Sequence, residues 1–349
     1  MSGSISPLRS ILILLQPLVS GALLAATHWY PEEVKTFLSS TIIKDTVGLS
    51  TIKAGLLPIV LFLVYHANKH LDRLALNNFT SDTTWDWKRE VVLVTGGSSG
   101  IGAAIVRDFS RRGITVVNVD ISPPPPSKGS TPLSKVHFYK LDVRSSAALS
   151  AVAEKIRGEV GAPTVVINNA GLGGGQLVLD ESDETLERTV AVNLVAHFKI
   201  AKEFAPDMIA KNHGHVVTVA SMASFVAVTS SASYAATKAG VLAFHEAFAG
   251  ELRWRHRASR VRMTSVHPMY VRTALTEALV TSAQWKKTPQ VLLEAEDVAA
   301  AVVAQVLKGE SAQLILPPRM GFVTTLRGWP HWMQIYARGL SRDLIFNPK

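Results

Sequence analysis

The amino-acid sequence predicts an α/β protein: a doubly wound parallel sheet with helices on both faces, preceded by N-terminal membrane-anchoring helices. Three observations carry this prediction. Short β-branched runs alternate with helical patterns between residues 88 and 320, which is typical of parallel sheets. The first of these runs leads into a glycine-rich loop, and two long apolar runs lie ahead of it.

The composition narrows the class of protein. The chain has 349 residues, a formal charge of +9, a hydrophobic fraction of 47% and no cysteine. Without cysteine there is no disulfide frame or thiolate chemistry, which fits a cytosol-facing protein. A basic, apolar chain fits nucleic acid or a membrane surface. The sequence has no zinc-finger spacing and no aromatic-glycine RNA signature, so we expect a membrane partner, no nucleic acid and no metal.

Two apolar runs open the chain, at residues 8–27 and 54–68. A helix needs ~20 apolar residues to cross a bilayer core. The first run fits a cleaved signal peptide, a membrane anchor or a buried soluble helix. The second run favours the anchor, as a hairpin that places the basic flanks Arg9, Lys69 and Arg73 on the cytosolic side.

The rest of the chain divides by composition. The predicted parts are an anchoring segment at 1–76, a polar linker at 77–87, the α/β domain at 88–320 and a basic-aromatic tail at 321–349. The tail suits a membrane interface, and packing against the core is the alternative.

The α/β domain opens with a strand and a glycine loop. Residues 90–95 are β-branched and short enough for a buried parallel strand. Thr95-Gly96-Gly97-Ser98-Ser99-Gly100-Ile101-Gly102 follows, and then a helical pattern. Backbone N–H groups at a helix N-terminus bind anions, and glycine permits a close approach. This segment therefore predicts a pyrophosphate site.

The second predicted strand, residues 116–120, ends in an acidic residue. Asp120 lies 24 residues after Gly96, where a carboxylate can accept hydrogen bonds from the adenosine ribose hydroxyls. It would repel a 2′-phosphate, and the glycine loop contains no Arg or Lys. The sequence therefore favours NAD over NADP.

Five further strands and a long helix follow. The third and fourth strands end in Asp142-Val143 and Asn169-Ala170-Gly171, and the long helical pattern contains Asn193. The strands are predicted at residues 137–141, 164–168, 216–220, 261–266 and 313–317, and the helix at 182–212.

The stretch from Ser221 to Lys238 has the strongest chemical pattern. Ser221 follows an apolar strand, and Tyr234 and Lys238 are four residues apart in a helix-favouring segment, so they share one helix face. A phenol has a pKa near ~10, and we expect a nearby ammonium to lower it. Tyr234 is then able to exchange a proton with an alcohol or a carbonyl.

Taken in order, these motifs resemble the short-chain dehydrogenase/reductase superfamily. The resemblance covers roughly residues 88–320 and rests on the glycine loop, Asn169-Ala170-Gly171, Asn193, Ser221 and Tyr234-x-x-x-Lys238. It implies a Rossmann-type fold and a nicotinamide dinucleotide.

The resemblance also implies a role for each site residue. Tyr234 is the general acid/base, Ser221 orients the substrate oxygen, Lys238 holds the nicotinamide ribose, and Asn193 holds a relay water. The cofactor residues that it implies are Gly96, Ser98, Ser99, Gly100, Ile101, Gly102, Asp120, Asp142, Val143, Asn169, Ala170, Gly171, Tyr234, Lys238, Val271 and Thr273.

The sequence departs from the family pattern at one point. Pro268 is followed by Met269 where the family usually has glycine, so we expect a side chain where the family's backbone passes close to the nicotinamide.

The anchor, the Trp85-Asp86-Trp87 lead-in and the tail look like one branch of the family, the membrane-bound retinol and hydroxysteroid dehydrogenases of the endoplasmic reticulum and lipid droplets. This implies a lipophilic alcohol or ketone as substrate, a role in lipid metabolism, and a catalytic domain facing the cytosol. A reductase of long-chain 3-keto lipids and a non-catalytic dinucleotide-binding scaffold are the alternatives, and a homodimer is left open.

Overall fold

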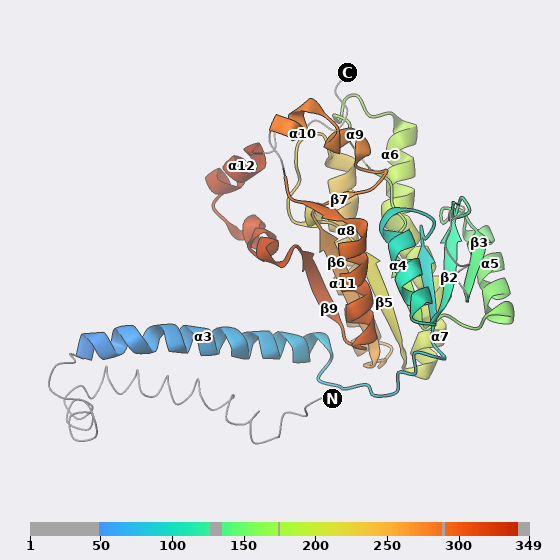
Figure 1. Ribbon diagram of the computed structural model, residues 1–349, viewed down its shortest axis with the longest axis horizontal. Coiled ribbons are helices and arrows are strands. Elements are labelled where there is room, and N and C mark those ends of the chain that lie inside the picture. The colour runs from blue at the N-terminus through green and yellow to red at the C-terminus, as the bar shows by residue number, and fades with distance from the viewer. Residues whose placement is uncertain (1–48, 126–134, 174, 288–289, 341–349) are drawn as a thin grey trace. The chain divides into compact units, whose positions relative to one another are not determined.

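The computed structural model describes residues 49–125, 135–173, 175–287 and 290–340 (Figure 1). The chain divides into two compact units, residues 1–75 and 76–349. The larger unit contains every strand of the described chain and all of the predicted site residues.

A seven-stranded parallel sheet forms the centre of the larger unit. Its order is β3-β2-β1-β4-β5-β6-β9, so the chain starts in the middle, builds outward to β3 and then returns to build the other half. This confirms the doubly wound, Rossmann-type fold, and a strand lies at each of the seven predicted places. The strands are β1 Val91–Thr95, β2 Thr115–Asp120, β3 Val136–Lys140, β4 Val165–Asn168, β5 Gly214–Val219, β6 Val261–Pro268 and β9 Ala312–Leu316.

Helices cover both faces of this sheet because alternate strand residues point to opposite sides. In β1, Leu93 packs in the core cluster that contains Ile156, Phe204 and other side chains of the helices α5, α7 and α8. Val94 packs on the other face, in the cluster that contains Phe109 and further side chains of α4 and α11. The helix bounds are α4 Gly100–Arg111, α5 Ser146–Glu159, α7 Ala196–Lys211, α8 Ala232–Trp254 and α11 Ala295–Leu307.

The predicted helix at 182–212 is one helical segment with a change of winding inside it. It consists of α6 Asp183–Val190, a π-helical turn at Ala191–Val195 and α7. Ser182 caps the start by accepting a hydrogen bond from Thr185 N. Such π turns are frequent at functional sites, and this one carries Asn193.

Short elements near the end of the sheet were not predicted. β7 Tyr270–Arg272 and β8 Leu292–Glu294 form a small parallel sheet, and α9 Glu277–Val280 and α10 Ala283–Lys287 lie between them. Three to five residues are too few for a hydrophobic period to be recognised.

The helix α3, Leu49–Leu76, belongs to the first unit except for its last residue. It includes the second apolar run, and the first run lies outside the described residues. In the part of the chain that the structure describes, no helix is both long and apolar enough to cross a membrane. The prediction of membrane-anchoring helices is therefore not confirmed.

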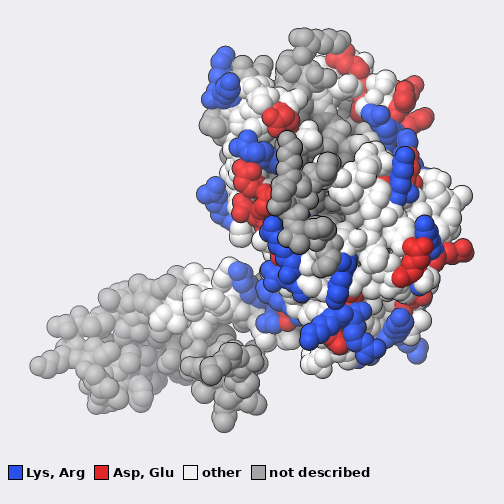
Figure 2. Space-filling view, turned by 45° about the vertical axis from the view of Figure 1, so that its right-hand side comes forward, with Lys and Arg blue, Asp and Glu red and all other residues white. Residues whose placement is uncertain are grey.

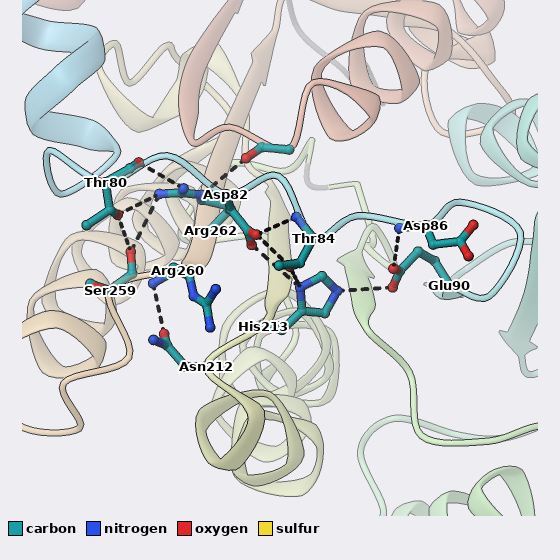
Figure 3. Close-up of polar contacts among 11 residues, drawn as sticks. Thr80, Asp82, Thr84, Asp86, Glu90, Asn212, His213, Ser259, Arg260 and Arg262 are labelled. Carbon is teal, nitrogen blue, oxygen red and sulfur yellow. Dashed lines mark hydrogen bonds and ion pairs between the residues drawn. The ribbon is translucent and has the colours of Figure 1, made fainter.

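Residues 77–90, which we call the strap, run along the larger unit and include the predicted linker (Figure 3). Arg262 of β6 binds the strap: its side chain is only 1% exposed and donates hydrogen bonds to the carbonyls of Asn77 and Thr80, each at 3.0 Å, and of Gly309 at 3.1 Å. The strap residue Asn77 also binds Ser311, whose N–H donates to its Oδ1 at 2.8 Å. These residues thus pack on the domain.

The other end of the strap is held by one histidine. His213 Nδ1 lies 3.5 Å from Asp82 Oδ2, and its Nε2 lies 3.3 Å from Glu90 Oε2. Trp85 and Trp87 stack with their ring centroids 4.9 Å apart. Thr84 joins the group through its hydroxyl, which lies 3.2 Å from His213 Nδ1 (Figure 3).

Basic side chains gather on the lower part of the larger unit in Figure 2. One basic group is at the end of α8, where Arg255, His256 and Arg257 are exposed. Arg253 lies over the exposed Trp254 ring, 4.2 Å from its centroid. Positive charge at a helix C-terminus complements the helix dipole.

Candidate active site

The glycine loop between β1 and α4 has a backbone that only glycine fits. Gly96 has a φ of +66°, a left-handed conformation that is costly for other residues. A Cβ on Gly102 would lie 2.1 Å from the Gly96 carbonyl oxygen. The close approach of loop and helix therefore requires glycine at both positions. The loop leads directly into the N-terminus of α4, and backbone N–H groups at such a terminus bind anions.

The ends of β1 and β4 are joined by reciprocal hydrogen bonds. Thr95 Oγ1 accepts from the N–H groups of Asn169 at 3.1 Å and Ala170 at 3.0 Å. Asn169 Nδ2 donates to the carbonyls of Thr95 at 3.0 Å and Gly96 at 3.2 Å. Asn169, predicted to lie along the cofactor, thus also holds the glycine loop. The role of Thr95 was missed, although its place at the end of a buried strand is a usable signal.

Asp120 is held at the end of β2 by backbone donors. Ser98 N donates to its Oδ2 at 3.1 Å and Ser122 N to its Oδ1 at 3.2 Å. Ser98 Oγ donates to the Ser122 carbonyl at 2.7 Å and accepts from Asn118 Nδ2 at 3.2 Å. These bonds fix the carboxylate beside the glycine loop. Asn118 is a supporting residue for which the sequence shows no signal.

Three of the four predicted catalytic side chains follow β5 or lie at the start of α8. Ser221 is the N-cap residue of a 3₁₀ turn, Met222–Ser224, directly after β5. Tyr234 and Lys238 lie in the first two turns of α8. Lys238 Nζ is 5.6 Å from the centroid of the Tyr234 ring. All three line the same cavity.

Asn193 is completely buried beneath this group. Its Oδ1 accepts from Leu172 N at 2.7 Å, and its Nδ2 donates to the Leu172 carbonyl at 2.9 Å. A Cβ on Gly171 would lie 3.5 Å from Asn193 Oδ1 and 3.8 Å from Lys238 Nζ. The Asn193 amide thus fixes the loop that follows β4. Both this amide and the Lys238 ammonium lie close to Gly171 of that loop.

The electrostatics of the tyrosine differ from the expectation. Burial raises the pKa of Tyr234, and a hydrogen bond with Ser221 acts in the opposite direction. Burial lowers the pKa of Lys238 to about 8, and its Nζ donates to the Val219 carbonyl at 3.0 Å. The expected lowering of the tyrosine pKa by the ammonium is therefore wrong for this structure, because the loss of hydration is the larger effect.

A cavity of about 1220 Å³ connects these groups. Its volume is above the range of ~300–1,000 Å³ that is usual for ligand pockets. Ser98, Gly102 and Asn193 support the site without lining this cavity. The predicted residues that line it are Gly96, Ser99, Gly100, Ile101, Asp120, Asp142, Val143, Asn169, Ala170, Gly171, Ser221, Tyr234, Lys238, Val271 and Thr273.

The cavity wall after β6 accommodates the unusual methionine. Met269 donates its N–H to the Leu316 carbonyl of the β9 edge at 2.8 Å and lines the cavity. It does not have a positive φ, so no glycine is needed. A side chain at this place therefore leaves the strand geometry intact.

The C-terminal segment forms another wall. A 3₁₀ helix η3, Pro318–Gly328, and the helix α12, His331–Gly339, follow β9. The side chains of this segment on the cavity include Phe322 and Leu326 of η3 and Trp329, which follows η3. Part of the tail thus lines the cavity of the larger unit, and residues 341–349 lie outside the described chain. The membrane-interfacial role of the tail stays a prediction.

His267 is a further residue beside the site. It is completely buried at the end of β6, and its Nδ1 lies 3.1 Å from the Ser221 carbonyl. Burial lowers the pKa of His267 to about 4, so the ring is neutral at pH 7 and Nδ1–H donates this bond. The sequence contained no signal for this role. Among the described residues no cluster of His, Asp and Glu is arranged to hold a metal ion.

The site defines a class of protein, the Rossmann-fold oxidoreductases. It combines a doubly wound sheet, a glycine loop and a tyrosine–lysine pair. The family model for short chain dehydrogenase matches residues 90–284. The chain therefore belongs to the short-chain dehydrogenase family, and it is an oxidoreductase.

Three relatives illustrate the family relationship. Dehydrogenase RED2 of Cochliobolus heterostrophus is 45% identical over 196 residues, which are 56% of this chain and 73% of the relative. Retinol dehydrogenase 10-B of Danio rerio is 37% identical, over 54% of this chain and 63% of the relative. Epidermal retinol dehydrogenase 2 of Mus musculus is 30% identical, over 68% and 77%. These names support the predicted branch of the family.

Solved structures support the fold. A 4-hydroxyisoleucine dehydrogenase complexed with NADH has a TM-score of 0.59 at 22% identity, and the match covers 65% of this chain and 96% of that one. The aldohexose dehydrogenase of Thermoplasma acidophilum has a TM-score of 0.56 at 23% identity, over 66% and 93%.

Proposed function

We propose that the protein interconverts a lipophilic alcohol, such as a retinoid or a steroid, and its aldehyde or ketone, with a nicotinamide dinucleotide as the second substrate. One observation carries the proposal. A single cavity extends from the glycine loop past Ser221 and Tyr234 to the aromatic C-terminal wall. It thus joins an anion-binding loop, a proton donor and an apolar surface.

The residues fit a dinucleotide at one end of this cavity. Gly96, Ser99 and Gly100 line this end, at the start of α4, where backbone N–H groups suit a pyrophosphate. The nicotinamide ring, when bound, supplies or accepts the hydride. Lys238 holds the ribose in this proposal.

The chain's own residues manage the proton. Because the pKa of Tyr234 is raised, the phenol is protonated at neutral pH and acts as the acid when a carbonyl is reduced. Ser221 orients the reacting oxygen, and its backbone carbonyl is held by His267. Asn193 holds a water that relays protons to Lys238 in this proposal. In the oxidation direction Tyr234 accepts the proton from the alcohol.

A turnover assay tests this function. We expect purified full-length protein to produce NADH from NAD⁺ and retinol or a hydroxysteroid, and to act poorly on small polar alcohols, because the cavity wall is aromatic. Product formation is followed by NADH absorbance and chromatography. Failure to turn over any retinoid, steroid or long-chain alcohol with either dinucleotide would contradict the proposal.

We also propose that NAD is preferred over NADP. The carboxylate of Asp120 lines the cavity and is fixed by Ser98 N and Ser122 N. Arg144 lines the same cavity, but its guanidinium is paired with Asp142, at 2.7 Å for the closest contact. The Arg144 guanidinium thus forms an ion pair with a carboxylate and does not offer its charge to a 2′-phosphate.

The substitution Asp120→Ala tests this preference. We expect the ratio of kcat/KM for NADP to that for NAD to rise about tenfold, since one repulsive charge is removed and one ribose acceptor is lost. Asp108→Ala, which removes a carboxylate from a surface pair with Arg112, is the control. A native protein that already prefers NADPH would show that Asp120 has been misinterpreted.

We further propose attachment to a membrane, at the endoplasmic reticulum or a lipid droplet, with the larger unit in the cytosol. The helix α3 presents Ile59, Leu61, Phe62 and Val64 with at least 50% of each residue exposed, and such side chains favour a lipid interface over water. Membrane fractionation of the protein with and without residues 1–75 checks the attachment. We expect the shortened protein to be released in large part, and its full retention would assign the membrane attachment to the tail. A homodimer remains a prediction.

A further inference from the structure

The aromatic wall of the cavity has to be held in place, because much of it is exposed. Phe322 is 59% exposed, Trp332 is 71% and Tyr336 is 70%, although all three line the cavity. Leu326 is the buried member, at 3%. The burial of apolar side chains therefore holds η3 and α12 only weakly against the domain. Figure 1 shows both helices after β9, at one side of the sheet.

Arg327 supplies a polar connection from this wall to the catalytic core. Its guanidinium donates to the Ser224 carbonyl at 3.0 Å and to the Phe225 carbonyl at 3.3 Å. Two N–H donors in a fixed fork suit two adjacent carbonyls. Arg327 directly follows Leu326, the buried residue of the wall.

The two acceptors belong to the turn that carries Ser221. Ser224 N donates to the Ser221 carbonyl at 3.0 Å, and Ser224 Oγ donates to the Lys238 carbonyl at 2.8 Å. The Phe225 ring packs on His267, with centroids 4.8 Å apart. Arg327 thus forms hydrogen bonds to a turn that is itself hydrogen-bonded to the backbone of both Ser221 and Lys238.

The far end of the wall is tied back to the same arginine. Gln334 of α12 is buried, and its Nε2 donates to the Trp329 carbonyl at 2.7 Å and to the Arg327 carbonyl at 3.3 Å. Arg338 in turn donates to Gln334 Oε1 at 2.7 Å. The position of Arg327 therefore sets the position of α12 as well as that of η3.

We propose that Arg327 is a positioning residue for bulky lipophilic substrates, because it sets the separation between the aromatic wall and the Ser221 turn. Within the described chain it is not one of the residues that line the cavity, so it acts through the wall. A large apolar substrate needs the wall to place its alcohol carbon beside Tyr234. A small alcohol does not reach the wall. This proposal rests on the proposed dehydrogenase function.

The test compares Arg327→Ala with two other variants in the full-length protein. We expect KM for retinol to rise about tenfold, because two charge-assisted but partly exposed hydrogen bonds are lost. kcat/KM for cyclohexanol should stay within about twofold, which also shows that the protein is folded. Arg327→Lys keeps one donor group and should recover part of the loss.

Arg319→Ala is the matched control. Arg319 is an exposed arginine of η3 that has no hydrogen-bond partner among the described residues, and we expect no change in KM for retinol.

A binding measurement separates this proposal from the proposed function. The Kd of retinol is measured by quenching of tryptophan fluorescence, without turnover. If the unchanged protein oxidises neither alcohol but Arg327→Ala weakens retinol binding about tenfold and Arg319→Ala does not, the dehydrogenase function fails and the positioning role stands. Equal losses for retinol and cyclohexanol, an unchanged retinol KM and Kd, or no retinol binding by the unchanged protein would each overturn it.

Discussion

Replacement of Tyr234 by phenylalanine should lower kcat by about 10²–10⁴, the usual cost of losing a positioned acid/base group. The substitution removes only the hydroxyl and leaves the ring against Lys238. The hydrogen bonds of Lys238 to the Val219 carbonyl and of Ser224 to the α8 backbone are unaffected. We therefore expect an unchanged Kd for the dinucleotide, measured by fluorescence titration, beside the loss of turnover.

Two other variants separate the roles of the site. Lys238→Ala should lower kcat at least as much and also weaken dinucleotide binding, because a cavity-lining ammonium is lost. Ser221→Ala should lower kcat without changing dinucleotide affinity. Tyr65→Phe, which removes the same hydroxyl from a 54% exposed tyrosine of α3 that does not line the cavity, is the matched control. Near-normal turnover by Tyr234→Phe would place the chemistry elsewhere.

The pH dependence gives a second readout for Tyr234. The phenol must be deprotonated to accept a proton from an alcohol. Since burial raises its pKa, the oxidation rate should increase with pH throughout the neutral range, and the reduction rate should not. The residual activity of Tyr234→Phe should lack this slope.

Replacement of Arg262 by alanine should lower the free energy of unfolding by about 3 kcal/mol or more. The side chain is buried, and its loss leaves the carbonyls of Asn77, Thr80 and Gly309 without these donors. Hydrogen bonds to charged groups contribute ~1.5–3 kcal/mol, and an unpaired buried acceptor costs ~1–3 kcal/mol. Urea unfolding of the protein measures the change.

Two companions make this result specific. Arg262→Lys should be nearly as destabilising, because one ammonium cannot match the guanidinium fork. Arg255→Ala, at an exposed arginine beyond the end of α8, should change stability by less than about 0.5 kcal/mol. A fully stable Arg262→Ala variant would mean that the strap is not bound through this residue.

The fold and the family follow from local patterns along the chain. The seven strands are short, mostly apolar runs that a local pattern predicts. β1, β4, β5 and β6 are buried along their whole length, whereas the edge strands β3 and β9 are only partly buried. The glycine loop and the pair Tyr234 and Lys238 are likewise local patterns. Their order along the chain was enough to indicate the family and to assemble one candidate site.

Properties that depend on distant residues follow only from the folded arrangement of the chain. Arg262 reaches Thr80 across 182 residues of sequence, and Arg327 reaches Ser224 across 103, so neither the strap nor the aromatic wall has a local pattern. The pKa of Tyr234 was misjudged for the same reason. Spacing showed that Lys238 is near, but the loss of hydration comes from the whole surrounding fold, and it exceeds the effect of one neighbouring charge.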